Sequence, residues 1–330
     1  MSEWRKYLNQ ISRDDGGSCI REHQAVLVKA RIDLEIIIPV YNTERYVGEC
    51  IESALNQNTK YTYRIIIVDD GSTDGCANII DGYADDSRIE IIHQENRGFS
   101  GARNRALDRI SAAYVTFLDS DDRLPNGAIE KLLGKAYDGD YDIVGGGYVR
   151  FDGEKYGPRA IPQVGQLYGF PWGKVYKSRL WSKIRFPEHY WFEDTVFAMI
   201  IHDSAPKKVS IQDVVYDYRL NRKGISAMSV GKPKVIDSFW ITSKLLKDRK
   251  KLGLPFDDKF QNQLLYQLKV NTIRIYTLGD EKANLANFIG SRECYLLHFD
   301  CRCKLSANKE IEDTLFNNNY RQFLLACLFL

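Results

Sequence analysis

The stretch VTFLDSDDRLPNG (115–127) ends an apolar run with three closely spaced carboxylates, Asp119, Asp121 and Asp122. Carboxylates at this spacing repel one another, and their pKa values rise unless a cation or a hydrogen-bond donor relieves the crowding. Mg²⁺ and similar hard cations prefer carboxylate oxygens and complete their coordination with water and substrate phosphates. An Asp-x-Asp pair here therefore indicates a metal–phosphate site, with solvated acids before a Pro-Asn-Gly turn as the alternative.

Polar residues also follow other apolar runs of strand length in the first half of the chain. These clusters are Tyr41-Asn42, Asp69-Asp70-Gly71-Ser72 and Asn96–Gly98. In an open α/β sheet the carboxyl ends of parallel strands meet at one edge, and ligands bind there. The sequence therefore predicts that these clusters and the Asp119–Asp122 acids form one shared site.

The elements expected to position this site alternate between strand and helix. Apolar, β-branched runs predict strands at 34–40, 63–70, 88–94, 113–119 and 141–149, and helical patterns lie at 44–57, 75–84, 100–110 and 126–136. Wholly apolar strands in this order are typical of a mostly parallel sheet with helices on both faces. Farther on we expect a loop or hairpin at 153–173, a helix at 193–204, a strand at 208–218 and mainly helices after about 233.

This pattern predicts three parts of the chain. We expect an N-terminal extension over 1–33 with a helix near 22–30, an α/β domain over 34–230, and a helical C-terminal region over 231–330. A chain of 330 residues is long enough for such an arrangement.

Composition excludes several classes of protein. The formal charge is only +2 and no basic tail is present, so nucleic acid is not an expected partner. The seven cysteines contain no C-x-x-C pair, which argues against a zinc site or a disulfide framework and favours a reducing compartment. The charged N-terminus lacks the apolar segment of a signal peptide, and no apolar run is long enough for a membrane span. We therefore expect a cytoplasmic protein.

Two common ways of binding phosphate are absent from the sequence. The turn after the first strand, PVYNTERY, has no G-x-G-x-x-G pattern, and G-x-x-x-x-G-K-[ST] occurs nowhere. Backbone amides of a glycine-rich loop are therefore not expected to hold the phosphates. A divalent cation, Mn²⁺ or Mg²⁺, held by Asp119 and Asp121 is the expected substitute.

With these motifs in order, the chain resembles the family-2 glycosyltransferases of the GT-A fold. The resemblance rests on IIIPVYNTERYVGECIESALNQ, IIIVDDGSTDG, NRGFSGARNRAL and YVTFLDSDD, and it resumes in PWGKVYKSRL, FEDTVFAMII and YDYRLNRKGIS. Members of that family build capsule, O-antigen and cell-wall polysaccharides in bacteria. The segments before 34 and beyond about 230 lie outside the resemblance.

The resemblance implies a UDP-sugar donor. It assigns to the nucleotide Pro39, Tyr41, Asn42, Asp70, Gly98, Arg103, Asp119, Arg219 and Ser226. In this assignment Asp70 accepts the imide N–H of uracil, Tyr41 packs on the base, and Asp69 supports the loop. Arg222 and Lys223 remain alternatives for the contact with the diphosphate, and a surface ion pair remains the alternative for Arg103.

The resemblance also implies the metal ligands and the catalytic acids. It assigns the metal to Asp119 and Asp121 and leaves Asp122 open. Asp194 becomes the general base that deprotonates the acceptor hydroxyl, with Glu193 holding a sugar. The alternative is that both acids only favour the positive end of a helix.

The acceptor is expected near Trp172 and Lys174, because an aromatic ring packs well on the apolar face of a sugar; a core position is the alternative for Trp172. The implied acceptor is a glycan on a lipid carrier at the inner face of the plasma membrane. The basic segment 232–251, with Phe239-Trp240 and Leu245-Leu246, fits contact with anionic lipid. Its alternative is a helix that packs its apolar side on protein. The C-terminal helices are also a candidate for a homodimer contact.

Together these residues predict an inverting, metal-dependent glycosyltransferase that moves a sugar from a UDP-sugar to a glycan hydroxyl. The alternative is a non-catalytic nucleotide-sugar-binding or assembly subunit with the same fold. A sugar-phosphate nucleotidyltransferase is disfavoured, because such enzymes carry a glycine-rich basic loop after the first strand and PVYNTERY is not one.

Overall fold

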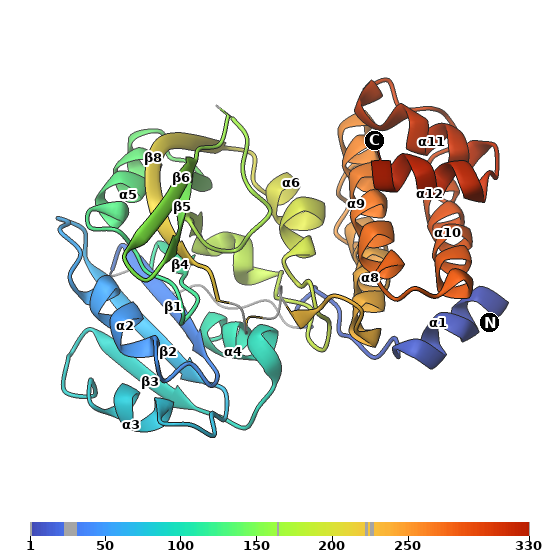
Figure 1. Ribbon diagram of the computed structural model, residues 1–330. Coiled ribbons are helices and arrows are strands. Elements are labelled where there is room, and N and C mark those ends of the chain that lie inside the picture. Colours follow the sequence, from blue (N-terminus) through green and yellow to red (C-terminus); the bar gives the residue numbers. More distant parts are fainter. Residues whose placement is uncertain (1, 23–31, 164, 222–223, 225–227, 330) are drawn as a thin grey trace. The chain divides into compact units, whose positions relative to one another are not determined.

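A computed structural model gives the structure of the chain, and it describes all residues except 1, 23–31, 164, 222–223, 225–227 and 330 (Figure 1). The contacts divide the chain into two compact units. The sheet unit consists of 19–188 and 204–221, and the helical unit consists of 1–18, 189–203 and 222–330. The domain boundaries predicted after residues 33 and 230 stay predictions. The helix expected near 22–30 falls on residues outside the described part of the chain.

The first half of the sheet is parallel, as predicted. Its strand order is β3-β2-β1-β4, and its members are β1 (Leu34–Val40), β2 (Tyr63–Asp69), β3 (Ile89–His93) and β4 (Tyr114–Phe117). The isoleucine and valine side chains of β1 and β2 are buried, which accounts for their apolar sequences.

The second half of the sheet contains two strands, β6 and β7, that were not predicted as separate strands. Its members are β5 (Ile143–Asp152), β6 (Lys155–Ala160), β7 (Lys174–Lys177) and β8 (Lys208–Arg219). The short β7 lies between β4 and β5 and is antiparallel to both. Two reversals leave β5, and its parallel neighbour β8, running in the same direction as β4. The carboxyl ends of β4, β5 and β8 therefore lie at the same edge of the sheet.

Helices cover both faces of the parallel strands (Figure 1). Alternate side chains of β1 belong to one apolar cluster with α2 (Val47–Leu55), α3 (Cys76–Asp81) and α5 (Ala128–Asp138). Helix α4 (Gly98–Leu107) packs on β1 and β2 and contributes nothing to that cluster, so it covers the other face. A 3₁₀ turn, η1 (Ser178–Ser182), follows β7.

Two glycines in β5 allow neighbouring segments to approach closely, Gly146 on the side of β8 and Gly147 on the side of the chain that follows β6. A Cβ on Gly146 would lie 2.6 Å from Val215 Cγ2 and 2.9 Å from the Asp213 carbonyl oxygen, both on β8. A Cβ on Gly147 would lie 2.4 Å from Ile161. Glycine is therefore required here by packing, although it is a poor strand residue by propensity.

The helical unit combines three segments of the sequence, one before, one within and one after the segments of the sheet unit. Its elements are α1 (Glu3–Ile11), η2 (Phe197–Ile201), α6 (His202–Ser204), η3 (Pro233–Ile236), α8 (Asp237–Lys251), α9 (Asp258–Tyr276), α10 (Glu281–Leu296), η4 (Ser306–Asn308), α11 (Lys309–Phe316) and α12 (Tyr320–Phe329). Helix α1 was not predicted. Its Trp4 packs against Phe239 and Trp240 of α8, with ring centroids 5.5 and 6.5 Å apart.

The apolar side chains of the basic segment 232–251 lie inside the helical unit. Phe239, Trp240, Leu245 and Leu246 are buried, so they do not form a surface for lipid. The Arg249 guanidinium is buried as well and donates to the carbonyl oxygen of Met199 at 2.6 Å. This burial favours the alternative in which the helix packs its apolar side on protein. Among the residues that the structure describes, no helix is long and apolar enough to cross a membrane.

Candidate active site

The loops that follow β1, β2 and β4 touch one another at the carboxyl edge of the sheet. The register places Val40 beside Asp69, and Ile37 beside Phe117. The Asn42 N–H donates to Ser72 Oγ at 3.2 Å, and Thr43 Oγ1 lies 2.9 Å from Ser120 Oγ as its hydrogen-bond donor. The structure thus brings together the strand-end clusters that the sequence singled out.

Pro39 and Asn42 shape the end of β1. The Leu118 N–H donates to the Ile37 carbonyl at 3.0 Å, so the backbone of Ile37 points toward β4. The backbone of Pro39, two residues later, points the same way, but Ile37 is the last residue of β1 that pairs with β4. The missing N–H of Pro39 therefore removes no ladder bond. Asn42 has a φ of 52°, which asparagine tolerates better than most residues, and its side-chain oxygen accepts from the Thr73 N–H at 2.8 Å. The adjacent residue, Tyr41, is 49% exposed.

Asp70 carries an unsatisfied acceptor. Its Oδ1 accepts from Gln94 Nε2 at 2.7 Å and from the Arg97 N–H at 2.9 Å, whereas its buried Oδ2 has no hydrogen-bond partner within the described residues. Burial raises the pKa of Asp70 even though both bonds favour the carboxylate. A buried acceptor left without a donor costs roughly 1–3 kcal/mol. A ligand N–H at this position would satisfy it.

Asp69 accepts a hydrogen bond from the same loop, which is the supporting role expected for it. Its Oδ1 accepts from the Ser72 N–H at 3.1 Å, and its Oδ2 lies 2.9 Å from His93 Nδ1. His93 Nε2 lies 3.0 Å from Asp81 Oδ1 on α3. The imidazole therefore connects the loop after β2 to α3.

Arg103 and Asp119 form an ion pair. The Arg103 Nη2 donates to Asp119 Oδ1 at 2.7 Å, and the guanidinium lies 5.3 Å from the centre of the Phe186 ring. The Arg103 side chain is buried, while 28% of the Asp119 side chain is exposed. Gly98, at the start of the same helix, has a φ of +72° and open space where a Cβ would be. Arg103 thus enters the site as the charge partner of Asp119.

The other two acids of the β4 loop have different surroundings. Asp121 Oδ2 accepts from Asn221 Nδ2 at 2.9 Å, and burial raises the pKa of Asp121. Asp122 is buried, and its two oxygens accept from the Tyr216 hydroxyl and the Arg219 N–H, each at 2.7 Å. Burial, then Asp121 and Asp119, hold the pKa of Asp122 well above its usual range. Asp122 therefore anchors β8, and Asp119 and Asp121 remain as the candidate metal ligands.

This donor set fits a cation that also binds substrate. Within the described ranges, no three His, Cys, Asp or Glu side chains gather closely enough to hold a metal ion by themselves. Mg²⁺ and Mn²⁺ at phosphate sites commonly use one or two carboxylates together with water and phosphate oxygens. The part-exposed Asp119 and the half-buried Asp121 match that pattern better than a site built from protein alone.

Tyr216 is a residue of the site that the sequence analysis missed. Its hydroxyl donates to Asp122 and also accepts from the Asp119 N–H at 3.2 Å, so one side chain fixes both ends of the acidic loop. Its ring is fully buried and stacks on Trp172, with centroids 4.4 Å apart. The tyrosine stands in the motif YDYRLNRKGIS, but nothing in the sequence shows which residue its hydroxyl reaches.

Trp172 and Lys174 lie in the interior. Trp172 is stacked between Phe170 and Tyr216. Lys174 Nζ donates to the carbonyl oxygens of Phe170 at 2.8 Å and Trp172 at 3.1 Å, and burial lowers the pKa of Lys174 to about 7. This burial favours the core position that the sequence left open for Trp172 and does not expose either side chain to an acceptor.

Arg219 lies beside the acidic loop and is already paired. Its Nε donates to the Asp121 carbonyl oxygen at 2.6 Å, and its guanidinium forms an ion pair with Glu49 of α2. Glu49 also pairs with Arg123 at 2.5 Å. Ser226 and its alternatives Arg222 and Lys223 lie outside the described residues.

The predicted catalytic acids belong to the helical unit. Glu193 and Asp194 stand in the first turn of the helical segment that contains η2, where the Phe197 N–H donates to the Asp194 carbonyl at 2.9 Å. The preceding Phe192 has a φ of 65°, and the guanidinium of Arg274 on α9 lies 3.7 Å from the centre of its ring. Burial lowers the pKa of Arg274, while the charges of Asp194 and Glu193 raise it. Arg274 is thus a cation facing both acids, and no sequence signal points to it.

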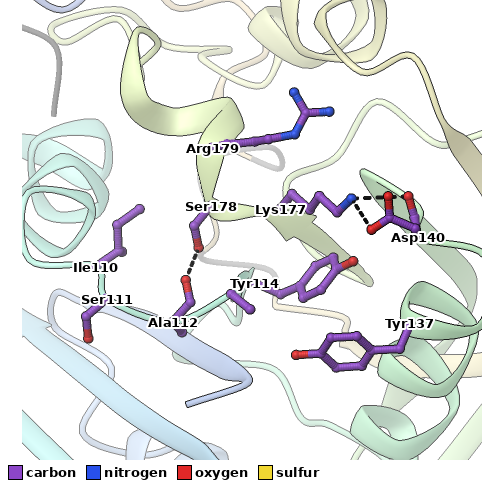
Figure 2. Close-up of a pocket in the computed structure, with 10 residues that line it drawn as sticks. Ile110, Ser111, Ala112, Tyr114, Tyr137, Asp140, Lys177, Ser178 and Arg179 are labelled. Carbon is purple, nitrogen blue, oxygen red and sulfur yellow. Dashed lines mark hydrogen bonds and ion pairs between the residues drawn. The ribbon is translucent and has the colours of Figure 1, made fainter. Parts of the chain in front are cut away.

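A separate cavity of about 340 Å³ lies at the other end of β4, which begins at Tyr114 (Figure 2). Each of its charged side chains is in an ion pair. Lys177 Nζ lies 2.6 Å from Asp140 Oδ1, and Arg179 Nη2 lies 2.5 Å from Asp142 Oδ1. This cavity is at the edge opposite the acidic loop, so we assign it no part in the site.

The sheet, the acidic loop and the strand-end clusters define a GT-A nucleotide-sugar fold, and the comparisons with known proteins agree. The sequence profile described as Glycosyl transferase family 2 matches residues 35–204. The chain belongs to this family of glycosyltransferases, which confirms the resemblance.

Relatives with known names are bacterial glycosyltransferases. Glycosyltransferase GlyA of Streptococcus pneumoniae is 32% identical over 218 residues, which is 58% of this chain and 31% of that protein. Glycosyltransferase GlyG of the same organism is 29% identical over 248 residues, which is 67% of this chain and 82% of GlyG. The chain therefore spans less than a third of the first relative and most of the second.

Solved structures share the fold. The crystal structure of Staphylococcus aureus TarS 1–349 has a TM-score of 0.68 at 17% identity, covering 89% of this chain and 90% of that one. The mannosyltransferase PcManGT from Pyrobaculum calidifontis has a TM-score of 0.51 at 16% identity, covering 98% of this chain and 92% of that one. The predicted GT-A fold with a helical C-terminal region is confirmed.

The bridging hydroxyl of Tyr216 leads to a first prediction. We expect Tyr216→Phe to weaken the binding of UDP with Mn²⁺ by about tenfold, because one hydrogen bond to each end of the acidic loop is lost. Titration calorimetry measures the affinity. Tyr176→Phe is the matched control, because its hydroxyl is also buried but donates to the Pro171 carbonyl at 2.9 Å. Equal affinities in the two variants would contradict the role of Tyr216.

The His93 bridge predicts a pH dependence of stability. The hydrogen bond to Asp69, with a second to Asp81, raises the pKa of His93 above 6.5. The stability that charged His93 contributes is therefore fully present below the unfolded pKa and is lost as pH rises through the folded pKa. We expect the free energy of unfolding of wild type to exceed that of His93→Gln by more at about pH 6 than at about pH 9. Urea denaturation at both pH values checks this, and an equal difference would refute it.

Proposed function

We propose that the chain is an inverting, metal-dependent glycosyltransferase that moves a sugar from a UDP-sugar to a hydroxyl of a glycan acceptor. The observation that carries the proposal is the unpartnered Oδ2 of Asp70 at the same sheet edge as Asp119 and Asp121. A buried acceptor for a base N–H and a pair of carboxylates for a diphosphate-bound cation are the two parts of a nucleotide-diphosphate site.

The base and ribose would occupy the loops after β1 and β2. The exposed ring of Tyr41 is available to pack on uracil, and Asp70 Oδ2 is available to accept the imide N–H. Asn42 holds the two loops together through Thr73, and Gly98 leaves space at the start of α4. Pro39 lies buried beneath them in β1.

The diphosphate would lie at the acidic loop. Oxygens of Asp119 and Asp121 would hold Mn²⁺ or Mg²⁺, which when bound neutralises the charge that develops on the departing UDP. Arg103 limits the negative charge of Asp119, and Asn221 orients Asp121. We assign Arg219 to the diphosphate as well, because its guanidinium lies next to the Asp121 carbonyl. Ser226 keeps the same assignment from the sequence.

Inversion needs a base on the face of the sugar opposite the leaving group. We assign that proton transfer to Asp194 and the positioning of a sugar to Glu193. Arg274 is close enough for its charge to interact with both acids, and it is the cation that would balance them.

The relatives support a role in bacterial surface-polymer synthesis. One of them is a poly(ribitol-phosphate) beta-glucosyltransferase of Bacillus spizizenii, 33% identical over 213 residues, and another is a teichuronic acid biosynthesis glycosyltransferase of Bacillus subtilis. TarS 1–349 has been solved with UDP-GlcNAc and with UDP, and PcManGT with GDP-Man and Mn²⁺. We propose a lipid-linked glycan acceptor, reached from the cytoplasm at the inner face of the plasma membrane.

Calorimetric titration of UDP tests the donor site. We expect tight binding to wild type with Mn²⁺, no binding with a chelator, and a loss of about tenfold or more for Asp121→Ala, because one metal ligand is removed. Asp138→Ala, whose side chain is 78% exposed on α5, is the control and should bind as wild type does. Absence of UDP binding to wild type in every condition would sink the proposal.

Substitution of Asp194 separates an enzyme from a non-catalytic subunit. We expect Asp194→Asn to lower the release of UDP from UDP-sugars by about a hundredfold or more while UDP affinity stays unchanged, because asparagine cannot accept the proton. Glu310→Gln, an exposed acid of α11, is the control. Unchanged turnover in Asp194→Asn would show that another group is the base. Absence of turnover in wild type, with UDP still bound, would favour the non-catalytic subunit.

A further inference from the structure

A cavity of about 500 Å³ lies between the β5–β6 hairpin, α5 and β8, entirely within the sheet unit. Its lining includes Tyr156 and Arg159 of β6, Lys131 of α5, and Gln212, Asp213 and Asp217 of β8. The volume is in the range of small-molecule sites in proteins, about 300–1,000 Å³. None of these residues was singled out by the sequence.

The cavity begins directly beside the acidic loop. Arg123, the residue after Asp122, exchanges two backbone hydrogen bonds with Asp217, at 3.1 and 3.0 Å. Strand β8 runs in the same direction as β4, and Asp217 is near its carboxyl end. Asp217 therefore lies near the same edge of the sheet as the acidic loop. A molecule in the cavity would therefore be a neighbour of the group bound at Asp121.

Tyr156 offers a fixed aromatic face. The residue is 55% exposed, its ring stacks on Phe151 with centroids 5.7 Å apart, and its hydroxyl accepts from Arg123 Nη2 at 2.5 Å. One side of the ring is thus held by Phe151 while much of the residue remains open to solvent. The C–H face of a sugar ring packs well on such a surface, as apolar groups do on aromatic rings.

The polar lining suits hydroxyl groups better than a polyanion. Asp213 and Asp217 accept hydrogen bonds, and Gln212 and Arg159 donate them, so sugar hydroxyls can find both kinds of partner. Lys131 is already paired with Asp213 at 3.0 Å. The two carboxylates, Asp213 and Asp217, are balanced by two cations, Lys131 and Arg159, so the lining has no net charge and suits an uncharged sugar.

We infer that this cavity binds a sugar unit of the acceptor glycan, with the Tyr156 ring as its platform. The inference rests on the proposed function, because it names the acceptor side of the same site. It also supplies the exposed aromatic that the buried Trp172 cannot provide.

Saturation-transfer NMR tests the inference with defined probes, the methyl β-glycosides of glucose, galactose and N-acetylglucosamine at millimolar concentration. We expect saturation of at least one glycoside by wild type, a loss of fivefold or more in Tyr156→Ala, and retention of most of the signal in Tyr156→Phe. Tyr276→Ala, which removes a 48% exposed tyrosine of α9, is the control and should match wild type. Equal signals in wild type and Tyr156→Ala, or none with wild type, would overturn the inference.

UDP release from UDP-sugars by wild type, measured in parallel, distinguishes failure of the proposed function from failure of the sugar-binding cavity. Release of UDP without saturation of any glycoside would leave the proposed function standing and refute the cavity alone. Saturation that depends on Tyr156 without UDP release would support the sugar site while refuting the transferase activity.

Discussion

Three carboxylates must coexist at the end of β4, and much of the sheet unit is arranged to allow it. Each acid is relieved by a different part of the chain. Arg103 of α4 pairs with Asp119, Asn221 bonds Asp121, and β8 satisfies both oxygens of Asp122. The partners of Asp121 and Asp122 lie on β8 or just after it. They can reach the acids only because β8 runs parallel to β5 and ends at the same edge of the sheet as β4. The repulsion between the acids thus explains why a strand so distant in sequence is needed there.

Sequence alone was enough for the parallel core and for the meeting of the polar clusters at one edge of the sheet. The strands expected at 34–40 and 63–70 match β1 and β2 closely, because buried parallel strands are apolar throughout. The polar residues that follow them stood out against that background. The loops they form do touch, as the bond between Asn42 and Ser72 shows. The local sequence pattern was enough to predict those strands whose burial requires apolar residues.

The features that sequence could not supply all depend on long-range pairing. The strand β7 has only four residues, which are too few to show the alternation of apolar and polar residues that predicts a strand. Its place between β4 and β5 is set by pairing with those two strands. Trp172 has the composition of a sugar platform and of a core residue alike, and only packing against Tyr216 separates them. Tyr216 and Arg274 act through partners that lie far away in the sequence, so no motif reveals what their polar groups reach.

The double pairing of Glu49 has a consequence for how the donor is held. Arg219 and Arg123 both rest on this one carboxylate. If a diphosphate takes up Nη2 of Arg219, it replaces Glu49 at that nitrogen, so the guanidinium exchanges one anion for another. The net gain is then a difference between two attractions that salt screens alike. Donor affinity should accordingly vary less with ionic strength than the formal charges at the site suggest, and Glu49 would set how readily the arginine changes partners.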